Sequence, residues 1–302
     1  MKKLVIFDLD GTLLNTIADL AAATNQALQY YGYPIHDTDA YRFFVGNGIN
    51  KLFERALPEN ERSEENILKI RSQFVPYYDK HNADFSRPYP GIAALLLALQ
   101  QQGIMIAVAS NKYQAATRKL IAHYFPEINF VEVLGQREGI PAKPDPSIVN
   151  DIIATAGVTK EEVLYVGDSN VDMQTAHNAG VTAVGVAWGF RPRTELEALH
   201  PAHIIEKAEE NGREISSTWA REELEQGNME AVSGLLGYDY AVHGEIVHGH
   251  ALGRTIGVPT INQIPPAEKL LPPFGVYVSE VKIEGKIYYG ITNIGVKPTV
   301  QE

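Results

Sequence analysis

The sequence contains no cysteine among its 302 residues. This absence excludes disulfide bonds, thiolate metal sites and cysteine nucleophiles, and it is compatible with a reducing compartment. Long hydrophobic runs are also missing, since runs such as Ile92–Leu99 fall far short of the roughly 20 residues of a membrane-spanning helix. The apolar start Leu4–Phe7 is interrupted by Asp8 and Asp10 before a signal peptide could form. We therefore expect a cytoplasmic protein with no membrane partner.

Positive charge is scarce, because 26 Lys and Arg stand against 37 Asp and Glu and give a net charge of −11. Residues 241–302 contain five residues of each sign, so the acidic excess lies in residues 1–240. Non-specific binding of nucleic acid needs a basic surface, and we therefore expect no nucleic-acid partner. The length predicts two or three domains. No pattern indicates the oligomeric state.

Several short runs are apolar at every position, which is typical of strands in a parallel sheet that helices cover on both faces. These runs are Leu4–Phe7, Ile104–Ala109, Val163–Val166 and Val181–Val186. Helical patterns alternate with them over Tyr113–Ala122, Pro146–Ala156 and Asn170–Ala179, the last followed by Gly180 as a helix C-cap. Alternating strands and helices predict an α/β fold with a doubly wound, Rossmann-like parallel sheet.

Two segments interrupt this pattern. Residues 15–86 show helical composition and no convincing strand, which predicts a helical cap inserted into a core formed by residues 1–14 and 87–210. After that core we expect a helical connector over 211–238. The last segment, 239–302, is rich in β-forming residues over Tyr240–Val247, Val276–Ile283 and Lys286–Asn293, with a turn at Glu284 and Gly285. It is expected to form a separate β domain.

Polar residues follow three of the predicted strands, namely Asp8, Ser110 and Asp168. Each alone would be an ordinary turn or capping residue. In open α/β sheets, however, ligands bind at the carboxyl ends of the strands, where these three side chains would converge. The sequence therefore predicts a ligand site at this edge of the sheet.

Four short motifs in order carry a family resemblance. They are Asp8-Leu9-Asp10-Gly11-Thr12-Leu13, Ser110-Asn111-Lys112, Lys143-Pro144-Asp145-Pro146 and Gly167-Asp168-Ser169-Asn170-Val171-Asp172. Their order and spacing resemble the haloacid-dehalogenase superfamily with a helical cap, over about residues 1–205. Within it, Pro88-Tyr89-Pro90-Gly91 and Trp188-Gly189-Phe190-Arg191 are similar to phosphoglycolate phosphatases.

This resemblance implies a Mg²⁺-dependent phosphatase that acts on a phosphate monoester through an aspartyl-phosphate intermediate. Asp8 would be the nucleophile and Asp10 the general acid and base, a residue that the dehalogenases of this superfamily lack. Ser110 and Lys143 would hold the transferring oxygens. Mg²⁺ would bind Asp8, the carbonyl of Asp10, and Asp168, and Asp172 would either brace this metal site or ligate the metal itself. The phosphate would also contact Gly11, Thr12 and Asn111.

Substrate choice is expected to reside in the cap. The candidates there are Arg42 and Asn47, with Lys51 and His81 also considered, and Phe44–Gly48 is the predicted specificity loop. A sugar phosphomutase would share all four motifs and differ mainly in the cap, so it stays an alternative.

The C-terminal segment resembles the kinase part of bacterial bifunctional riboflavin kinase and FAD synthetase. The resemblance lies in Gly249–Asn262, Gly275-Val276-Tyr277 and Asn293–Thr299. It implies a β-barrel-like module for Mg-ATP and riboflavin, with Gly253, Arg254, Thr260 and Asn262 at the nucleotide. The adenylyltransferase H-x-G-H motif is absent, so FAD synthesis is not expected.

The sequence ends at Glu302, before the position of the catalytic glutamate in that kinase family. We therefore expect an incomplete barrel that does not phosphorylate riboflavin as it stands. The phosphatase substrate is expected to be phosphoglycolate-like, or FMN because of the neighbouring flavin module. Two alternatives stay open, a full-length FMN phosphatase and riboflavin kinase, and a module that binds flavin or nucleotide without catalysis.

Overall fold

The computed structural model describes residues 2–207, 209–210, 213–214, 217–236, 240–247, 260–283 and 286–295. Contacts between residues divide the chain into two compact units, Met1–Ile215 and Ser216–Glu302. The finer division of the chain at residues 14, 86, 210 and 238 stays a prediction. Among the described residues, no helix is both long and apolar enough to cross a membrane.

The first unit is built on a six-stranded sheet in the order β5-β4-β1-β6-β7-β8. All five neighbouring pairs in this sheet are parallel. The strands are β1 Leu4–Phe7, β4 Met105–Tyr113, β5 Phe130–Gln136, β6 Val163–Gly167, β7 Thr182–Val186 and β8 His203–Ile205. This order confirms the predicted doubly wound parallel sheet.

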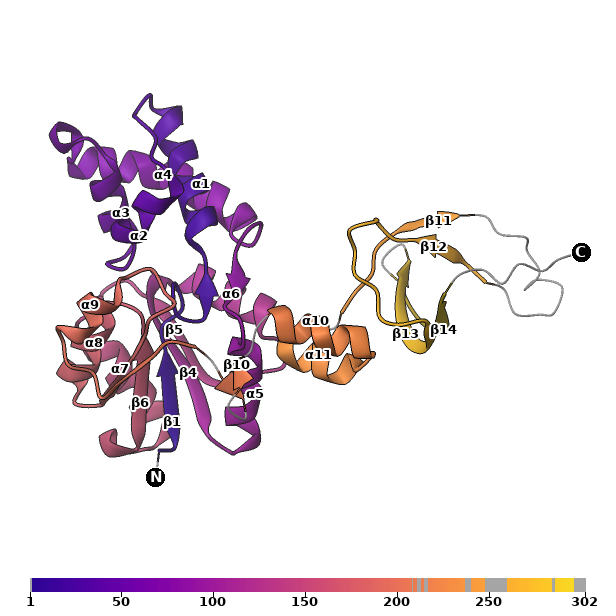
Figure 1. The fold of residues 1–302 in the computed structure, drawn as a ribbon. Coiled ribbons are helices and arrows are strands. Elements are labelled where there is room, and N and C mark those ends of the chain that lie inside the picture. The colour runs from indigo at the N-terminus through magenta and orange to yellow at the C-terminus, as the bar shows by residue number, and fades with distance from the viewer. Residues whose placement is uncertain are drawn as a thin grey trace, which may run out of the picture. The chain divides into compact units, whose positions relative to one another are not determined.

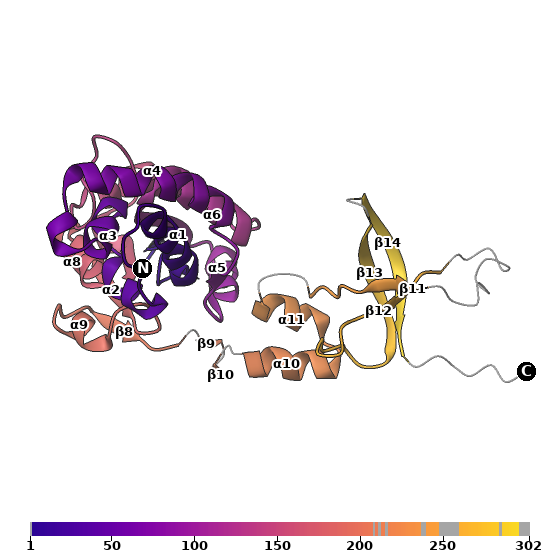
Figure 2. The ribbon, with the colours of Figure 1, turned by 90° about the horizontal axis from the view of Figure 1, so that it is seen from above.

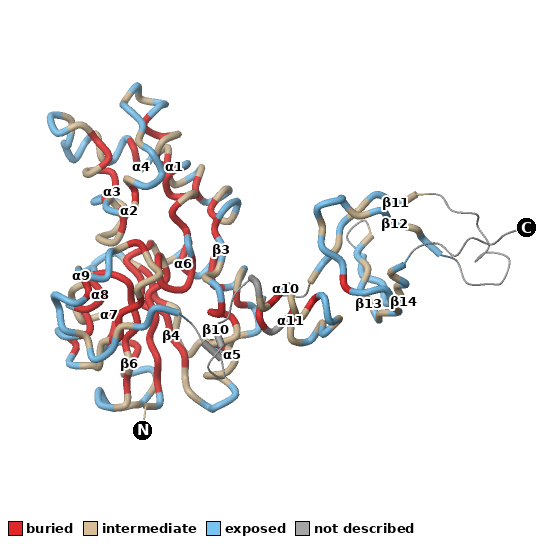
Figure 3. Tube along the Cα trace, in the orientation of Figure 1, coloured by how far each residue is buried: buried red, intermediate tan, exposed pale blue. Residues whose placement is uncertain are grey.

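Both faces of the sheet are covered, as the all-apolar strand runs require. Along β1, Leu4 and Ile6 join a cluster with α7 and α8, whereas Val5 and Phe7 join a cluster with α5 and α6. Successive strand residues point to opposite faces, so a strand covered on both sides has no polar position. Figure 2 shows α5 and α6 on one side of the first unit and α8 on the opposite side, and Figure 3 shows that the inner strands β4 and β6 are largely buried.

The helices of these layers are α5 Ile92–Gln101, α6 Gln114–Tyr124, α7 Ser147–Ala156 and α8 Asn170–Ala179, and the short helix α9 Arg193–Glu197 follows β7. Helix α8 begins with a capping box in which Ser169 and Asp172 bond each other's backbone N–H. It ends at Gly180, whose φ of +72° is the left-handed conformation of a C-cap glycine.

The inserted segment is helical, which confirms the predicted cap. Its helices are α1 Ile17–Tyr30, α2 Tyr41–Phe44, α3 Ile49–Ala56 and α4 Glu64–His81, with short 3₁₀ turns at Thr38–Ala40 and Glu59–Glu61. The chain leaves and re-enters the core through β2 Leu14–Asn15 and β3 Arg87–Pro88, which pair antiparallel. The cap lies over the carboxyl edge of the sheet (Figure 1).

The second unit contains α10 Ser217–Gln226 and α11 Met229–Leu236, followed by two antiparallel strand pairs. One pair is β11 Glu245–Val247 with β12 Asn262–Ile264, and the other is β13 Gly275–Ile283 with β14 Lys286–Ile294. A two-residue pair, β9 Glu209–Glu210 and β10 Arg213–Glu214, precedes them in the first unit. The predicted strand Tyr240–Val247 is regular only from Glu245, and the predicted turn at Glu284 and Gly285 lies outside the described residues.

Candidate active site

The carboxyl edge of the sheet brings together residues from three strands. Asp8 and Asp168 follow β1 and β6 directly, and both are buried. We expected β4 to end at Ala109, but the strand continues to Tyr113. Its pairing with β5 shifts register between Ala109 and Tyr113, so Ser110 lies in an irregular stretch of the strand. This irregularity is typical of strands that present side chains at a site.

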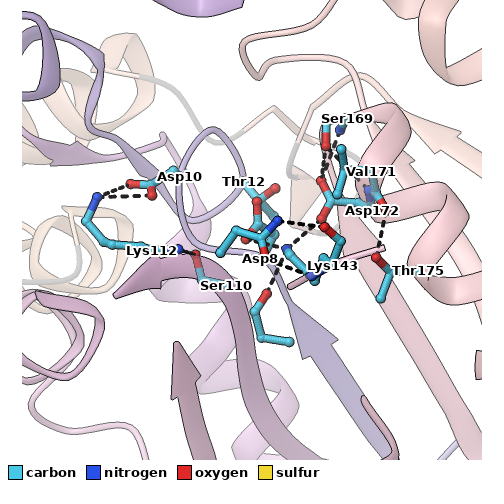
Figure 4. A network of polar contacts seen from close by, with 12 residues as sticks. Asp8, Asp10, Thr12, Ser110, Lys112, Lys143, Ser169, Val171, Asp172 and Thr175 are labelled. Carbon is cyan, nitrogen blue, oxygen red and sulfur yellow. Dashed lines mark hydrogen bonds and ion pairs between the residues drawn. The ribbon is translucent and has the colours of Figure 1, made fainter. Parts of the chain in front are cut away.

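Lys143 is the central cation of the cluster (Figure 4). Its ammonium group lies 2.8 Å from Asp8 Oδ1 and 2.8 Å from Asp172 Oδ1. It also donates to the Ala109 carbonyl at 2.9 Å and to the Tyr165 hydroxyl at 3.0 Å. Burial opposes the charge of this lysine, but the attraction of the two carboxylates outweighs it and raises the pKa of Lys143 well above its usual value.

The cluster carries more negative than positive charge. One carboxylate oxygen from each of Asp8, Asp168 and Asp172 lies within 4.8 Å of the others, and all three residues are buried. Burial, then repulsion by Asp172, raises the pKa of Asp8 to about 7 despite its lysine partner. Burial, then repulsion by Asp172 and Asp8, raises the pKa of Asp168 well above its usual value. Three carboxylates against one ammonium leave two negative charges, which a divalent cation with oxygen ligands would neutralise.

Two glycines make room for the Asp168 carboxylate. A Cβ atom on Gly11 would lie 2.3 Å from Asp168 Oδ2, and one on Gly189 would lie 2.2 Å from Asp168 Cβ. Gly11 also has a φ of +91°, which side chains other than glycine rarely adopt. The backbone N–H of Phe190 donates to Asp168 Oδ2 at 2.7 Å, and the Thr12 hydroxyl donates to Oδ1 at 3.3 Å. The carboxylate is therefore fixed from both sides.

Asp172 is already saturated with donors. Its Oδ1 accepts from Lys143 at 2.8 Å and from the Tyr165 hydroxyl at 3.2 Å. Its Oδ2 accepts from the Ser169 backbone N–H at 3.1 Å and from the Ser169 hydroxyl at 2.6 Å. A carboxylate with both oxygens occupied in this way orients its neighbours, and Asp172 therefore positions Lys143.

Asp10 has a cation of its own. The ammonium group of Lys112 lies 2.9 Å and 3.0 Å from its two carboxylate oxygens, and the Thr16 hydroxyl donates to Oδ1 at 2.6 Å. Neither Lys112 nor Thr16 was among the residues that we assigned to the site from the sequence. Lys112 belongs to the quoted motif Ser110-Asn111-Lys112 at the end of β4, and its place in that motif was the signal available.

Gly11, Thr12 and Asn111 were expected to contact the phosphate, but most of their polar groups form hydrogen bonds within the protein. The Gly11 N–H donates to the Leu14 carbonyl at 2.8 Å, and the Thr12 hydroxyl donates to Asp168. The Asn111 amide donates to the Gly46 carbonyl at 2.9 Å and to the Lys143 carbonyl at 3.0 Å, and it accepts from the Lys143 N–H at 2.8 Å. Asn111 thus joins the Lys143 loop to the cap. Their contact with phosphate stays a prediction.

A cavity of about 510 Å³, counting its part open to solvent, lies between the sheet edge and the cap. Its core side includes Asp8, Asp10, Ser110, Lys112 and Lys143. The cap side is mainly apolar, with Val45, Ile49, Leu52, Phe74 and Tyr78. The Ser110 hydroxyl accepts from the Lys112 N–H at 3.2 Å, which leaves its hydrogen available to a ligand.

The expected cap residues Arg42 and Asn47 are not among the residues that line this cavity. Arg42 pairs with Asp39 at 3.4 Å, and Asn47 accepts from Arg55 at 2.7 Å. Of the predicted specificity loop Phe44–Gly48, Val45, Gly46 and Gly48 line the cavity. Lys51 pairs with Glu54, and His81 pairs with Asp84. The cap therefore presents backbone and apolar side chains to the cavity.

In the second unit, Thr260 is exposed and Asn262 begins β12. Gly253 and Arg254 lie outside the described residues, as do most of Gly249–Asn262 and the segment 296–299. The nucleotide site that we expect from these residues stays a prediction.

Known families match both units. Residues 5–186 match the family model described as haloacid dehalogenase-like hydrolase, and residues 236–302 match the model described as riboflavin kinase. A phosphoglycolate phosphatase of Mannheimia succiniciproducens is 33% identical over 210 residues, which cover 68% of this chain and 94% of that protein. The phosphoglycolate phosphatase of Vibrio cholerae is 34% identical over 207 residues, which cover 67% and 92%.

Solved structures agree with these matches. The crystal structure of a predicted phosphoglycolate phosphatase from Haemophilus somnus superimposes with a TM-score of 0.63 at 31% identity. The superposition covers 67% of this chain and 93% of that one. The structure of CbbY from Rhodobacter sphaeroides, in complex with phosphate, has a TM-score of 0.58 at 21% identity, which shows the shared fold.

Proposed function

Because the chain belongs to the haloacid dehalogenase-like hydrolases, as a phosphatase of that family fused to a riboflavin kinase domain, we propose that it hydrolyses a small phosphate monoester through an aspartyl-phosphate intermediate. The observation that carries this proposal is the charge of the buried cluster. Three buried carboxylates lie close together while one ammonium pairs with two of them, and such a buried triad is typical of the Mg²⁺ site in this family.

Each residue of the cluster has a role in this proposal. Asp8 attacks phosphorus and becomes phosphorylated, and water then releases the phosphate. Lys143 and the Ser110 hydroxyl bind the phosphoryl oxygens, whose charge must be neutralised as an anionic nucleophile approaches. Mg²⁺ would be held by Asp8, Asp168 and the Asp10 carbonyl, and it would supply positive charge at the phosphoryl group. Asp172 would brace this arrangement through Lys143.

Asp10 is proposed to protonate the leaving oxygen and then to activate the attacking water. It lines the same cavity as Asp8, and its carboxylate is oriented by Lys112 and Thr16. We expect Asp10→Ala to lower kcat by about 10²–10⁴-fold, because general acid and base catalysis contributes that much. Steady-state phosphate release measures this effect. A change in kcat below about threefold would show that Asp10 does not transfer the proton.

Two substrates are proposed on different grounds. Phosphoglycolate follows from the activity for which the similar proteins are named, and FMN follows from the neighbouring kinase domain. A phosphate-release screen with Mg²⁺ over phosphoglycolate, FMN, sugar phosphates and nucleotides tests both. We expect Mg²⁺-dependent release from at least one of them. A sugar phosphate isomerised without release would favour a phosphomutase, and no release from any ester would sink the phosphatase proposal.

The riboflavin kinase match favours a second, flavin-related function for the C-terminal unit. We propose that this unit binds riboflavin and Mg-ATP, and that Thr260 and Asn262 contact the nucleotide. Titration with both ligands, followed by chromatography of the flavins, separates the alternatives. Binding with formation of FMN indicates a kinase, and binding without FMN indicates a regulatory module.

A further inference from the structure

Lys112 occupies an unusual place in the cavity. Its side chain is only 3% exposed, and its ammonium group lies against both oxygens of Asp10. The same group lies 4.9 Å from the ring centre of Tyr78, which belongs to cap helix α4. Lys112 therefore stands where the core acid, the cap and the cavity meet. The roles assigned so far give it no task beyond holding Asp10.

The other cation of the cavity is fully occupied. Lys143 has four oxygen partners within 3.0 Å, and two of them are carboxylates of the cluster. Among the described residues that line the cavity, no cap residue is cationic. The nearby cap cations pair elsewhere, as shown by Arg42 with Asp39 and Lys51 with Glu54. The ammonium group of Lys112 has three N–H donors, and its hydrogen bonds in the described structure are the two to Asp10, so one donor is left for an anionic group on the leaving part of a substrate.

The cap side of the cavity makes such a partner necessary. Leu20, Ile49, Leu52 and Phe74 form an apolar lining in which an unpaired carboxylate would be strongly disfavoured. A neutral leaving group would meet no such penalty. An anion beside the phosphate is therefore favoured at Lys112 over the apolar part of the lining.

We propose that Lys112 is a specificity-determining residue for the phosphoglycolate already proposed, and that it binds the carboxylate on the carbon next to the ester oxygen. This inference rests on the proposed function, because it takes Asp10 as the group that reaches the ester oxygen. Lys112 Nζ lies within 3.0 Å of both Asp10 oxygens, so a carboxylate one carbon away from that ester oxygen comes within reach of the same ammonium. FMN, whose ribityl leaving group is neutral, is then disfavoured.

The test compares two esters of the same length in two enzymes. Phosphoglycolate carries the carboxylate, and 2-hydroxyethyl phosphate carries a hydroxymethyl group in its place. The wild-type enzyme should prefer phosphoglycolate in kcat/KM by about 10–100-fold, the range that a buried charged hydrogen bond provides. Lys112→Met should reduce this preference to about threefold or less, mainly by raising KM for phosphoglycolate.

The ratio of kcat/KM for the two esters distinguishes two roles of Lys112, which are recognition of the substrate carboxylate and support of Asp10. Loss of the lysine beside Asp10 lowers turnover of both esters, and this shared effect cancels in the ratio. Lys112→Arg should restore part of the preference. Lys80→Met, a change of the same type on the exposed face of α4, should leave the ratio unchanged.

Three results would overturn the inference. An equal loss for both esters in Lys112→Met would show that the lysine only supports Asp10. If the wild-type enzyme hydrolysed FMN or 2-hydroxyethyl phosphate better than phosphoglycolate, the proposed carboxylate site at Lys112 would be wrong. The phosphatase proposal would still hold. Absence of turnover with every ester, p-nitrophenyl phosphate included, would overturn the proposed function and the inference with it.

Discussion

Asp8→Asn should reduce phosphate release by about 10⁴-fold or more and at the same time make the metal-free protein more stable at neutral pH. The loss of activity follows because an amide is a poor nucleophile toward phosphorus. The gain in stability follows because burial and repulsion by Asp172 raise the pKa of Asp8 to about 7, so its charge is disfavoured in the folded state. The asparagine keeps the shape of the side chain and removes that charge.

The pH dependence has a defined sign. The carboxyl group of Asp8 has an ordinary pKa of 3.8 in the unfolded chain and a higher one in the folded protein. Between pH 4 and about 7 the folded state therefore holds a proton that the unfolded state has lost, and stability decreases as pH rises through this window. Asp168, whose pKa is also raised, adds to the decrease.

Thermal unfolding with a chelator at several pH values measures this effect. The wild-type Tm should fall from pH 5 to pH 8, and the fall should be smaller in Asp8→Asn, where only the contribution of Asp168 is left. Added Mg²⁺ should raise the wild-type Tm more than that of the variant, since ligand binding stabilises the folded state. If Asp8→Asn were less stable than the wild type at pH 8 without metal, the inference that the Asp8 charge destabilises the metal-free cluster would be wrong.

Lys143→Met should lose both activity and stability. Removal of the ammonium leaves Asp8 and Asp172 buried without their cation, and breaking a buried ion pair in this way costs about 3–5 kcal/mol. Phosphate release should fall to the level of Asp8→Asn, because the phosphoryl oxygens lose their positive partner. Urea unfolding and steady-state kinetics measure the two effects.

A second variant keeps this prediction testable if Lys143→Met fails to fold. Lys143→Met combined with Asp172→Asn removes one charge of each sign, and it should recover part of the stability but none of the activity. Lys3→Met is a matched control, because Lys3 forms a surface ion pair with Glu162 and is 58% exposed. The control should change the free energy of unfolding by less than about 1 kcal/mol. Equal losses in Lys143→Met and the control would contradict the central place of Lys143.

The sequence predicted the inner strands of the sheet and missed its edges. The four all-apolar runs correspond to β4, β1, β6 and β7, which occupy the interior of the strand order. The strands at the two ends, β5 and β8, were not predicted. An edge strand is less completely covered, so β5 contains Glu132 and Gln136, and β8 begins with His203. A search for fully apolar runs passes over such strands for this physical reason.

The candidate site divides in a similar way. Strand ends point to Asp8, Ser110 and Asp168 because position at the edge of a sheet is encoded locally. The ion-pair partner of Asp10 is not encoded locally, since Lys112 lies 102 positions further along the chain. The cap residues Arg42 and Asn47 were chosen by residue type alone, and their contacts with Asp39 and Arg55 depend on the packing of the cap.

Phe190 belongs to two parts of the molecule at once. Its backbone N–H holds the Asp168 carboxylate, while its ring packs into the hydrophobic cluster of the cap, and Arg191 beside it donates to the Val45 carbonyl of the cap at 3.0 Å. The cap is therefore not an exchangeable module. A chimera that received the cap of a distant relative would need a hydrophobic pocket in that cap into which this ring could pack. Without one, the Asp168 carboxylate would lose its fixed position, and the chimera should bind Mg²⁺ poorly although every proposed Mg²⁺ ligand had been retained.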